Sequence, residues 1–385
     1  MRIGFDAKRA FQNNTGLGHY SRTLLSSLAT YFPQHEYFLF APKITNRFCT
    51  DDFSNMHPVS PQKFPEKMFP SLWRSNWVTK DLLKNKIVLY HGLSHEIPVG
   101  ITSTGIRSVV TIHDLIFERY PRQHHKIDVL IYRKKFRYAC THADKVIAVS
   151  LQTKQDLMNF YHVPEEKISV CYQSCNPRFG QTISDNEKER IRELYKLPRQ
   201  FFLSVGSIIE RKNLLIVCKA MQRLKNKIAI PLVVIGQGGK YKHAVQQFIR
   251  EHKLEKEIIF LSDSAVAKAS EGFKNSADFP AIYQLATAMI YPSVFEGFGI
   301  PVLEALWSRL PVITSNVSCM PETGGDAALY VSPYDYEDLA HKMETIATDS
   351  TVAQQMKEKG WLHAQQFTQQ KCAVAVMDVY NQLLL

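Results

Sequence analysis

Short apolar segments alternate along the whole chain with longer segments of helical periodicity. In the first half, apolar segments predict strands at residues 2–6, 37–40, 87–91, 109–113, 146–150 and 168–172. In the second half, the same pattern predicts strands at residues 201–205, 232–235, 258–261, 288–291, 312–314 and 329–331. Because helical periodicity follows each strand, the pattern predicts an α/β protein with two doubly wound parallel sheets.

The length of 385 residues corresponds to about two domains. A polar, charged segment with helical spacing and a closing proline, residues 186–199, lies where the strand pattern restarts. We therefore expect an N-terminal domain over residues 1–180 and a C-terminal domain over residues 181–368. A last helix with an apolar stripe is expected over residues 369–385.

Composition narrows the class of protein. The chain is 45% hydrophobic and 22% charged, which is typical of a globular protein. No apolar run approaches the roughly 20 residues that span a bilayer, and the N-terminus predicts a strand rather than a signal peptide, so we expect a cytoplasmic protein. The seven cysteines are scattered without zinc-ligand spacing, so we expect reduced and mostly buried thiols.

The formal net charge of +11 suggests an anionic partner. Zinc-finger, helix-turn-helix and aromatic-basic strand signatures are absent from the sequence, so nucleic acid is not the expected partner. Basic and apolar residues interleave over residues 119–137, and basic and aromatic residues over residues 63–77. These segments suit weak contact with an anionic membrane surface, and a solvated basic face remains the alternative.

The string YPSVFEGFGIPVLEA, residues 291–305, combines two acids with a glycine turn and a helix start. Pro301 fits the first turn of a helix, where its missing N–H costs nothing. A loop that enters a helix in this way offers N–H groups to a phosphate. Glu296 lies in the loop and can accept hydrogen bonds from hydroxyls, whereas Glu304 is expected in the first helical turn, where the helix dipole favours its charge. The predicted donor-binding residues of the turn are Gly297, Phe298, Gly299 and Ile300.

This string resembles the E-x7-E signature of the retaining glycosyltransferases of the GT-B fold, specifically glycosyltransferase family 4. The resemblance extends from the N-terminal glycine loop to about Val331. It implies a GT-B fold, in which two Rossmann-like domains face a central cleft. The N-terminal domain would bind the acceptor and the C-terminal domain the nucleotide-sugar donor. The helix at residues 369–385 would cross back to the N-terminal domain.

Two segments of the first half carry the same resemblance. The sequence NNTGLGHY places Gly16 and Gly18 in a strand-to-helix turn, which resembles the family loop that closes over the diphosphate and the acceptor. The sequence TIHDLIFERYP resembles the segment with the family's active-site histidine. His113 would then hydrogen-bond a hydroxyl of the transferred sugar, while Asp114 either orients this imidazole or caps the next helix. The loop at residues 91–98 resembles the acceptor-side loop, and we assign it no chemistry.

In the second half, the strand at residues 201–205 leads into a glycine and two adjacent cations. This segment resembles the family's diphosphate-binding segment, in which an Arg/Lys pair neutralises the phosphates, with Gly206 as the glycine and Lys212 as the lysine. Some family members carry the arginine directly after the glycine, where this chain has Ser207, and Arg211 is the residue that could substitute for it. Residues 235–239 resemble its second glycine turn, and residues 261–264 the segment that holds the base. Residues 265–279 are longer than the family's usual connector, and residues 306–311 also depart from its pattern.

Together these matches imply a retaining hexosyltransferase with His113, Glu296 and Lys212 as catalytic residues. The resemblance favours mannose, then glucose, as the sugar, carried by GDP or UDP and transferred to a glycan or lipid-linked glycan. The resemblance further implies that the enzyme acts in the synthesis of a cell-surface polysaccharide or lipopolysaccharide, at the inner face of the cytoplasmic membrane. Since the sequence contains no Asp-x-Asp pair, we expect metal-independent transfer with no cofactor beyond the nucleotide sugar.

Other classes of function are compatible with the same two-domain α/β architecture. A sugar-nucleotide hydrolase or epimerase would act without an acceptor, and a binding protein would lack turnover altogether. An NAD-dependent oxidoreductase is a further alternative for doubly wound sheets. The first glycine turn argues against it, because Ser21 stands where the third glycine of G-x-G-x-x-G belongs.

Overall fold

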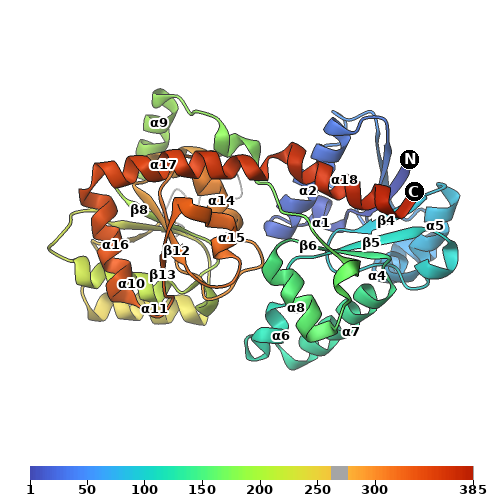
Figure 1. Ribbon diagram of the computed structural model, residues 1–385, viewed down its shortest axis with the longest axis horizontal. Helices are drawn as coiled ribbons and strands as arrows, with labels where there is room; N and C mark the ends of the chain where they lie inside the picture. Colours follow the sequence, from blue (N-terminus) through green and yellow to red (C-terminus); the bar gives the residue numbers. More distant parts are fainter. Residues whose placement is uncertain (262–275, 385) are drawn as a thin grey trace. The chain divides into compact units, whose positions relative to one another are not determined.

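The computed structural model describes residues 1–261 and 276–384. These residues form two compact units, one made of residues 1–175 and 367–384 and the other of residues 176–261 and 276–366. We refer to them as unit 1 and unit 2 (Figure 1). Each unit has its own parallel sheet, so the α/β class with two doubly wound domains is confirmed.

Unit 1 has a seven-stranded sheet in the order β3-β2-β1-β4-β5-β6-β7. Its strands are β1 (Arg2–Asp6), β2 (Glu36–Phe40), β3 (Met56–Val59), β4 (Leu89–Gly92), β5 (Arg107–Ile112), β6 (Lys145–Ala148) and β7 (Ile168–Val170). Its helices are α1 (Lys8–Gln12), α2 (Gly16–Tyr31), α3 (Phe64–Met68), α4 (Pro70–Leu72), α5 (Val78–Lys84), α6 (Ile116–Arg119), α7 (Lys126–His142), α8 (Leu151–Tyr161) and α18 (Gln369–Leu384).

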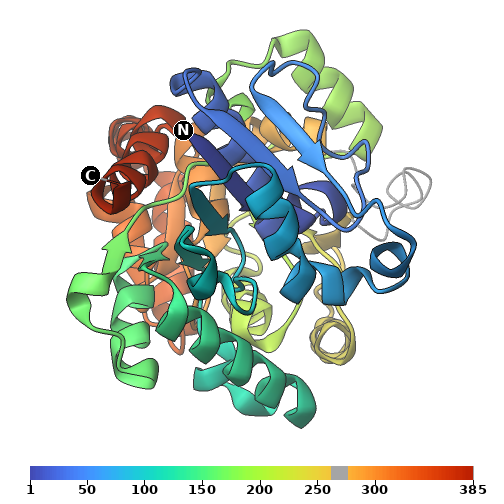
Figure 2. The ribbon, with the colours of Figure 1, turned by 90° about the vertical axis from the view of Figure 1, so that its right-hand side faces the viewer.

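Both faces of this sheet are buried, as the alternation along β2 shows. Tyr37 and Leu39 belong to the core on one face, while Phe38 and Phe40 belong to the core on the other. Successive side chains of a strand point to opposite faces, so an apolar run of this kind requires helices on both sides. The strands β1 and β2 lie side by side in Figure 2, paired in parallel.

The sequence pattern does not predict β3, a four-residue strand at the edge of the sheet. Its sequence is MHPV, and Pro58 cannot donate to a ladder. An edge position tolerates this proline, because only one side of the strand pairs with a neighbour. The pairing of β3 with β2 therefore depends on tertiary structure rather than on local apolar periodicity.

The C-terminal helix α18 belongs to unit 1 and packs beside α2 (Figure 1). Val376, Met377 and Tyr380 are buried in the core of this unit. The hydroxyl of Tyr380 also lies 2.6 Å from Nδ1 of the buried His91, whose Nε2 lies 2.7 Å from Oγ1 of Thr111. The last helix is thus fixed to the sheet by apolar burial and by a buried polar chain.

Unit 2 has a six-stranded parallel sheet in the order β10-β9-β8-β11-β12-β13. Its strands are β8 (Phe202–Val205), β9 (Leu232–Ile235), β10 (Ile258–Phe260), β11 (Ala288–Tyr291), β12 (Val312–Ser315) and β13 (Ala328–Val331). Its main helices are α9 (Asp185–Tyr195), α10 (Leu214–Leu224), α11 (Lys240–Glu251), α13 (Phe279–Leu285), α14 (Ile300–Trp307), α15 (Met320–Gly324), α16 (Tyr336–Thr348) and α17 (Ser350–Ala364). The strands β8 and β11 are neighbours, so the loops that follow them start at the same edge.

All seven cysteines are free thiols, and six of them are buried, as the sequence analysis predicts. Among the described helices, none is both long and apolar enough to cross a bilayer.

Candidate active site

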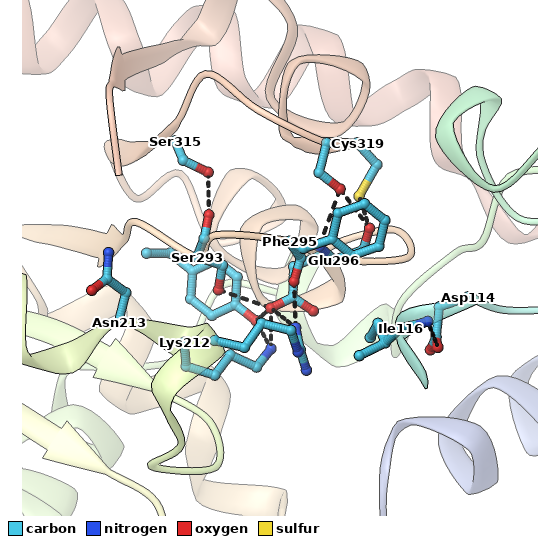
Figure 3. A network of polar contacts seen from close by, with 12 residues as sticks. Asp114, Ile116, Lys212, Asn213, Ser293, Phe295, Glu296, Ser315 and Cys319 are labelled. Carbon is cyan, nitrogen blue, oxygen red and sulfur yellow. Dashed lines mark hydrogen bonds and ion pairs between the residues drawn. The ribbon is translucent and has the colours of Figure 1, made fainter. Parts of the chain in front are cut away.

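Glu296 lies at the centre of a polar network in the loop after β11. Its side chain is buried, and its Oε1 atom is 2.7 Å from Nη1 of Arg211 and 2.6 Å from Nζ of Lys212. The hydroxyls of Ser293 and Tyr291 donate to the same oxygen, at 2.8 and 3.3 Å. Figure 3 shows Lys212 and Ser293 pointing toward Glu296. The structure therefore brings together three of the residues predicted for donor binding.

The two cations are held by the turn between β8 and α10. This turn contains Gly206 at φ 138° and Asn213 at φ 61°, and the amide of Asn213 donates to the carbonyl of Pro292 at 3.2 Å. Arg211 also donates to the carbonyl of Phe295, and its own carbonyl accepts from the N–H of Val294 at 2.9 Å. These bonds join the turn after β8 to the loop after β11, which fixes both cations beside Glu296.

The backbone of Glu296 is held from the segment after β12. Its N–H donates to the hydroxyl of Ser318 at 3.1 Å, and this hydroxyl donates to the carbonyl of Glu296 at 2.7 Å. The thiol of Cys319 approaches the same carbonyl at 3.2 Å (Figure 3). Neither Ser318 nor Cys319 is among the predicted site residues, although both lie within the part of the chain that resembles the family.

Glu296 is a carboxylate at neutral pH. Burial by itself would raise the pKa of Glu296, but the charges of Lys212 and Arg211 and the hydrogen bonds from Lys212 and Ser293 lower it to about 2. Burial lowers the pKa of Lys212, and the charge of Glu296 opposes this effect. In the absence of a ligand, the carboxylate thus offsets one of the two positive charges. An incoming diphosphate would find positive charge that is already positioned.

Glu304 lies in the second turn of α14, so its predicted position in the first turn is wrong. The helix begins at Ile300 and has no acid in its first turn. The hydroxyl of Tyr283 donates to Oε2 of Glu304 at 2.9 Å, and burial raises the pKa of Glu304 to about 7. Desolvation of the carboxylate outweighs the hydrogen bond from Tyr283, so the helix dipole does not keep the pKa of Glu304 low. Glu304 is instead a carboxyl that can change its protonation state near neutral pH.

The start of α14 is as the string predicts, with Gly299 as the cap and Pro301 in the first turn. Gly299 has φ 92°, and a Cβ atom there would lie 2.5 Å from Cε of Met320. Only glycine satisfies both the left-handed backbone and the close packing. Phe298 is buried beside this cap, and its carbonyl accepts from the hydroxyl of Thr323. Gly297 to Ile300 therefore connect Glu296 to the N-terminal turn of the helix.

The glycine turn after β9 packs against the turn after β8. A Cβ atom on Gly236 would lie 1.8 Å from the carbonyl oxygen of Gly206, and one on Gly238 would lie 2.4 Å from that of Ile208. These two glycines thus allow two loops of unit 2 to approach each other. The predicted base-binding segment at residues 261–264 and the segment at residues 265–279 fall mostly outside the described residues.

In unit 1, the predicted glycine loop forms the start of α2. Gly16 is its first residue, and a Cβ atom there would meet nothing within 4 Å. Gly18 lies two positions further along, where a Cβ atom would lie 2.0 Å from the carbonyl oxygen of Asn13. Packing therefore explains the glycine at position 18 but not the one at position 16. Open space at the start of a helix is compatible with a ligand phosphate there.

His113 directly follows β5 and is buried. Its Nε2 atom donates to the carbonyl of Leu93 at 2.9 Å, and its Nδ1 lies 3.4 Å from the amide nitrogen of Gln173. Tyr20 packs edge-on against the ring at 4.5 Å. Burial lowers the pKa of His113 to about 4, so the ring is neutral, with Nδ1 as its acceptor. A sugar hydroxyl could therefore only donate to His113, at Nδ1.

Asp114 binds the start of the next helix, although the N-cap of that helix is Leu115. Its Oδ1 atom accepts from the N–H of Ile116 at 3.1 Å, at the start of α6 (Figure 3). The imidazole of His113 is instead oriented by Leu93, Gln173 and Tyr20. Gln173 lies 60 residues from His113 in the sequence, so no local motif could indicate it.

Two family models match the chain. The model described as Glycosyltransferase Family 4 matches residues 15–178, and the model described as Glycosyl transferases group 1 matches residues 185–362. With the two parallel sheets, these matches define the protein as a glycosyltransferase of the GT-B fold. Within this class, the chain belongs to glycosyltransferase family 4.

Individual relatives agree with this assignment. The O-antigen chain mannosyltransferase B of Escherichia coli is 26% identical over 405 residues, which cover 100% of both chains. An Escherichia coli protein named UDP-Gal:alpha-D-GlcNAc-diphosphoundecaprenol alpha-1,3-galactosyltransferase is 26% identical over 65% of each chain. Among solved structures, a glycosyltransferase from Rickettsia africae superposes with a TM-score of 0.75 over 100% of this chain and 98% of that one. At 18% identity, this last similarity concerns the fold alone.

Proposed function

We propose that the protein is a retaining hexosyltransferase that transfers mannose from GDP-mannose to a hydroxyl of a glycan acceptor, in the synthesis of a cell-surface polysaccharide. The observation that carries the proposal is the convergence of Arg211 and Lys212 on Glu296 inside the E-x7-E string. The mannosyltransferase relative that aligns over the full length supports the choice of mannose. UDP-glucose is the second donor to test.

The leaving diphosphate would be stabilised by the two cations after β8. Lys212 donates to Glu296 and to Tyr291, which leaves one of its three N–H bonds for a phosphate oxygen. Removing a single preorganised donor of this kind typically costs about 2.7–4 kcal/mol of transition-state stabilisation. We propose that these cations replace a divalent metal, so that transfer proceeds without one.

Glu296 would then accept hydroxyls of the transferred hexose, and Glu304 those of the ribose. With its hydrogen on Nε2, His113 would accept a hydroxyl hydrogen of the hexose at Nδ1. Retention by double displacement needs a nucleophile at the anomeric carbon. The predicted residues include no such nucleophile, so we propose attack by the acceptor hydroxyl on the face that the diphosphate leaves.

The acceptor is proposed to be a glycan linked to a lipid through phosphate. The galactosyltransferase relative names a diphosphoundecaprenol-linked acceptor, which supports this class. On α7, Ile127 and Leu130 have 71% and 64% of their surface exposed beside exposed Lys134 and Arg137. Apolar and basic side chains on one exposed helix suit an anionic membrane surface, where such an acceptor would be found.

Product analysis tests this function. The full chain is incubated with GDP-mannose or UDP-glucose, with and without a diphospholipid-linked N-acetylglucosamine acceptor. We expect GDP-mannose to be consumed only when the acceptor is present, and NMR of the product to show an α-linked mannose. Consumption without acceptor would identify a hydrolase or epimerase, and binding without consumption a non-catalytic protein.

A further inference from the structure

Arg9 is a cation of unit 1 that lacks a partner. It lies in α1, directly after β1, and its Nε atom is buried without a hydrogen bond. Within residues 1–261 and 276–384, no side chain or carbonyl accepts a hydrogen bond from this guanidinium. The residue is only partly buried, so an unpaired guanidinium with a buried Nε atom can take a ligand that supplies an acceptor.

The nearby acids already pair with other cations. Both carboxylate oxygens of Asp6 lie 3.0 Å from Nε of Arg74. Glu96 accepts from Nη1 of Arg74 at 2.9 Å and from Nζ of Lys135 at 3.1 Å. Asp6 and Glu96 thus pair with Arg74 and Lys135. Neither acid pairs with the guanidinium of Arg9.

The loop after β4 adds two polar groups near Arg9. Ser94 is 4% exposed, and its Oγ atom is buried without a partner. The next residue, His95, has φ 65°, a left-handed backbone conformation that is rare for residues other than glycine. Its Nδ1 atom lies 3.4 Å from the N–H of His113, and its ring stacks on Phe136 at 4.5 Å.

This geometry leaves the second nitrogen of His95 as a donor. Because Nδ1 accepts from the backbone, the hydrogen of the neutral ring is on Nε2, which has no partner in the described part of the chain. Burial lowers the pKa of His95, and the charges of His113 and Arg9 lower it further. The strands β1 and β4 are neighbours in the sheet, and Arg74 joins Asp6 to Glu96. Arg9 and His95 therefore belong to segments that leave the same edge of the sheet.

We propose that Arg9, Ser94 and His95 form a phosphate-binding site in unit 1, which holds a phosphoryl group of the acceptor. The inference rests on the proposed transferase function for the identity of the ligand. A guanidinium, a hydroxyl and an imidazole N–H are all donors, and no carboxylate is available among them. Such a set suits the oxygens of a phosphate better than sugar hydroxyls, which also need acceptors.

The site is distinct from the cations proposed for the donor. Arg211 and Lys212 belong to unit 2, whereas Arg9, Ser94 and His95 belong to unit 1. His95 contacts His113 with ring centroids 5.1 Å apart. A phosphate held by Arg9 would thus lie near the histidine that we expect to contact the transferred hexose. This favours an acceptor whose phosphate is close to the reacting hydroxyl, rather than one with a long intervening glycan.

Binding of inorganic phosphate tests the site without any assumption about turnover. The full chain with Arg211→Ala and Lys212→Ala lacks the two cations proposed to bind the donor diphosphate. A 31P NMR titration of this variant then measures the remaining affinity for inorganic phosphate. We expect Arg9→Gln on this background to weaken phosphate binding at least tenfold, and Ser94→Ala to weaken it severalfold. Arg2→Gln is the matched control, since Arg2 is at the opposite end of β1 and donates to the carbonyl of Asn85.

Kinetics then separate this inference from the proposed function. We expect Arg9→Gln to raise KM for the diphospholipid-linked acceptor at least tenfold and to leave the Kd for GDP-mannose unchanged, with partial recovery in Arg9→Lys. Phosphate affinity that is equal in Arg9→Gln and Arg2→Gln would overturn the site. If no variant transfers mannose but Arg9→Gln still loses phosphate, the transferase proposal fails, while the phosphate site stands and its assignment to the acceptor falls.

Discussion

Replacing Glu296 with glutamine should destabilise the free protein and make it more responsive to nucleotide. The substitution keeps the shape of the side chain but removes the negative charge that pairs with Arg211 and Lys212. The pKa of Glu296 changes from 4.5 to about 2 on folding, which corresponds to a stabilisation of about 3 kcal/mol at neutral pH. Since the folded-state pKa is the lower one, this stabilisation is present in full above pH 4.5 and is lost as the pH falls toward 2.

A diphosphate that binds to the same cations should restore part of the lost stability. We therefore expect Glu296→Gln to lower the free energy of unfolding by about 1–3 kcal/mol, and GDP to raise its Tm by more than it raises that of the wild type. Urea unfolding at pH 7 and thermal melting with and without GDP measure the two effects. Glu337→Gln is the matched control, because Glu337 pairs with Arg223 at the surface and is 56% exposed.

The reasoning about Glu296 would be refuted by either of two results. One is a stability of Glu296→Gln equal to that of the Glu337→Gln control. The other is a smaller response to GDP in Glu296→Gln than in the wild type, since this would mean that the diphosphate does not use Arg211 and Lys212.

Three further predictions follow from the site. Lys212→Ala should lower kcat by roughly a hundredfold or more while the circular dichroism spectrum stays unchanged; wild-type turnover would remove Lys212 from the site. Glu304→Gln should be as stable as the wild type at pH 4 and about 1–3 kcal/mol more stable at pH 8, because the raised pKa of about 7 means that the wild type loses stability as the pH rises from 4.5 through 7. Urea unfolding at the two pH values checks this, and equal stabilities at pH 8 would contradict it. Gly299→Ala should lower the free energy of unfolding by about 1–3 kcal/mol, because Gly299 has φ 92° and the new Cβ atom would clash with Met320. Gly16→Ala, by contrast, should leave the Tm unchanged and lower the activity. A lower Tm for Gly16→Ala would indicate a packing role for Gly16 instead.

The fold could be predicted from the sequence because buried parallel strands have local signatures. The strand predicted at residues 288–291 is β11 as observed, and Pro301 lies in the first turn of α14 as expected. By contrast, β3 has no apolar alternation and contains a proline, so only its pairing with β2 defines it. An edge strand of this kind is determined by tertiary contacts rather than by its own residues.

The candidate site could be predicted only in part, for a related reason. Glu296 and Lys212 were found through a motif, but their direct contact depends on β8 and β11 being neighbours in the sheet. The protonation of Glu304 depends on burial and on Tyr283, and neither can be read from the local sequence. The absence of a partner for Arg9 is likewise a property of three-dimensional packing, because the sequence places Asp6 only three positions away.

The role of Arg211 and Lys212 as metal-free ligands of the donor diphosphate is the central claim. Isothermal titration of GDP-mannose in the presence of EDTA, with the wild type and with Lys212→Ala, tests it most directly. The account predicts that EDTA leaves the wild-type Kd unchanged and that Lys212→Ala binds at least tenfold more weakly. Binding that EDTA abolishes and Mg²⁺ restores, or an unchanged Kd in Lys212→Ala, would contradict it.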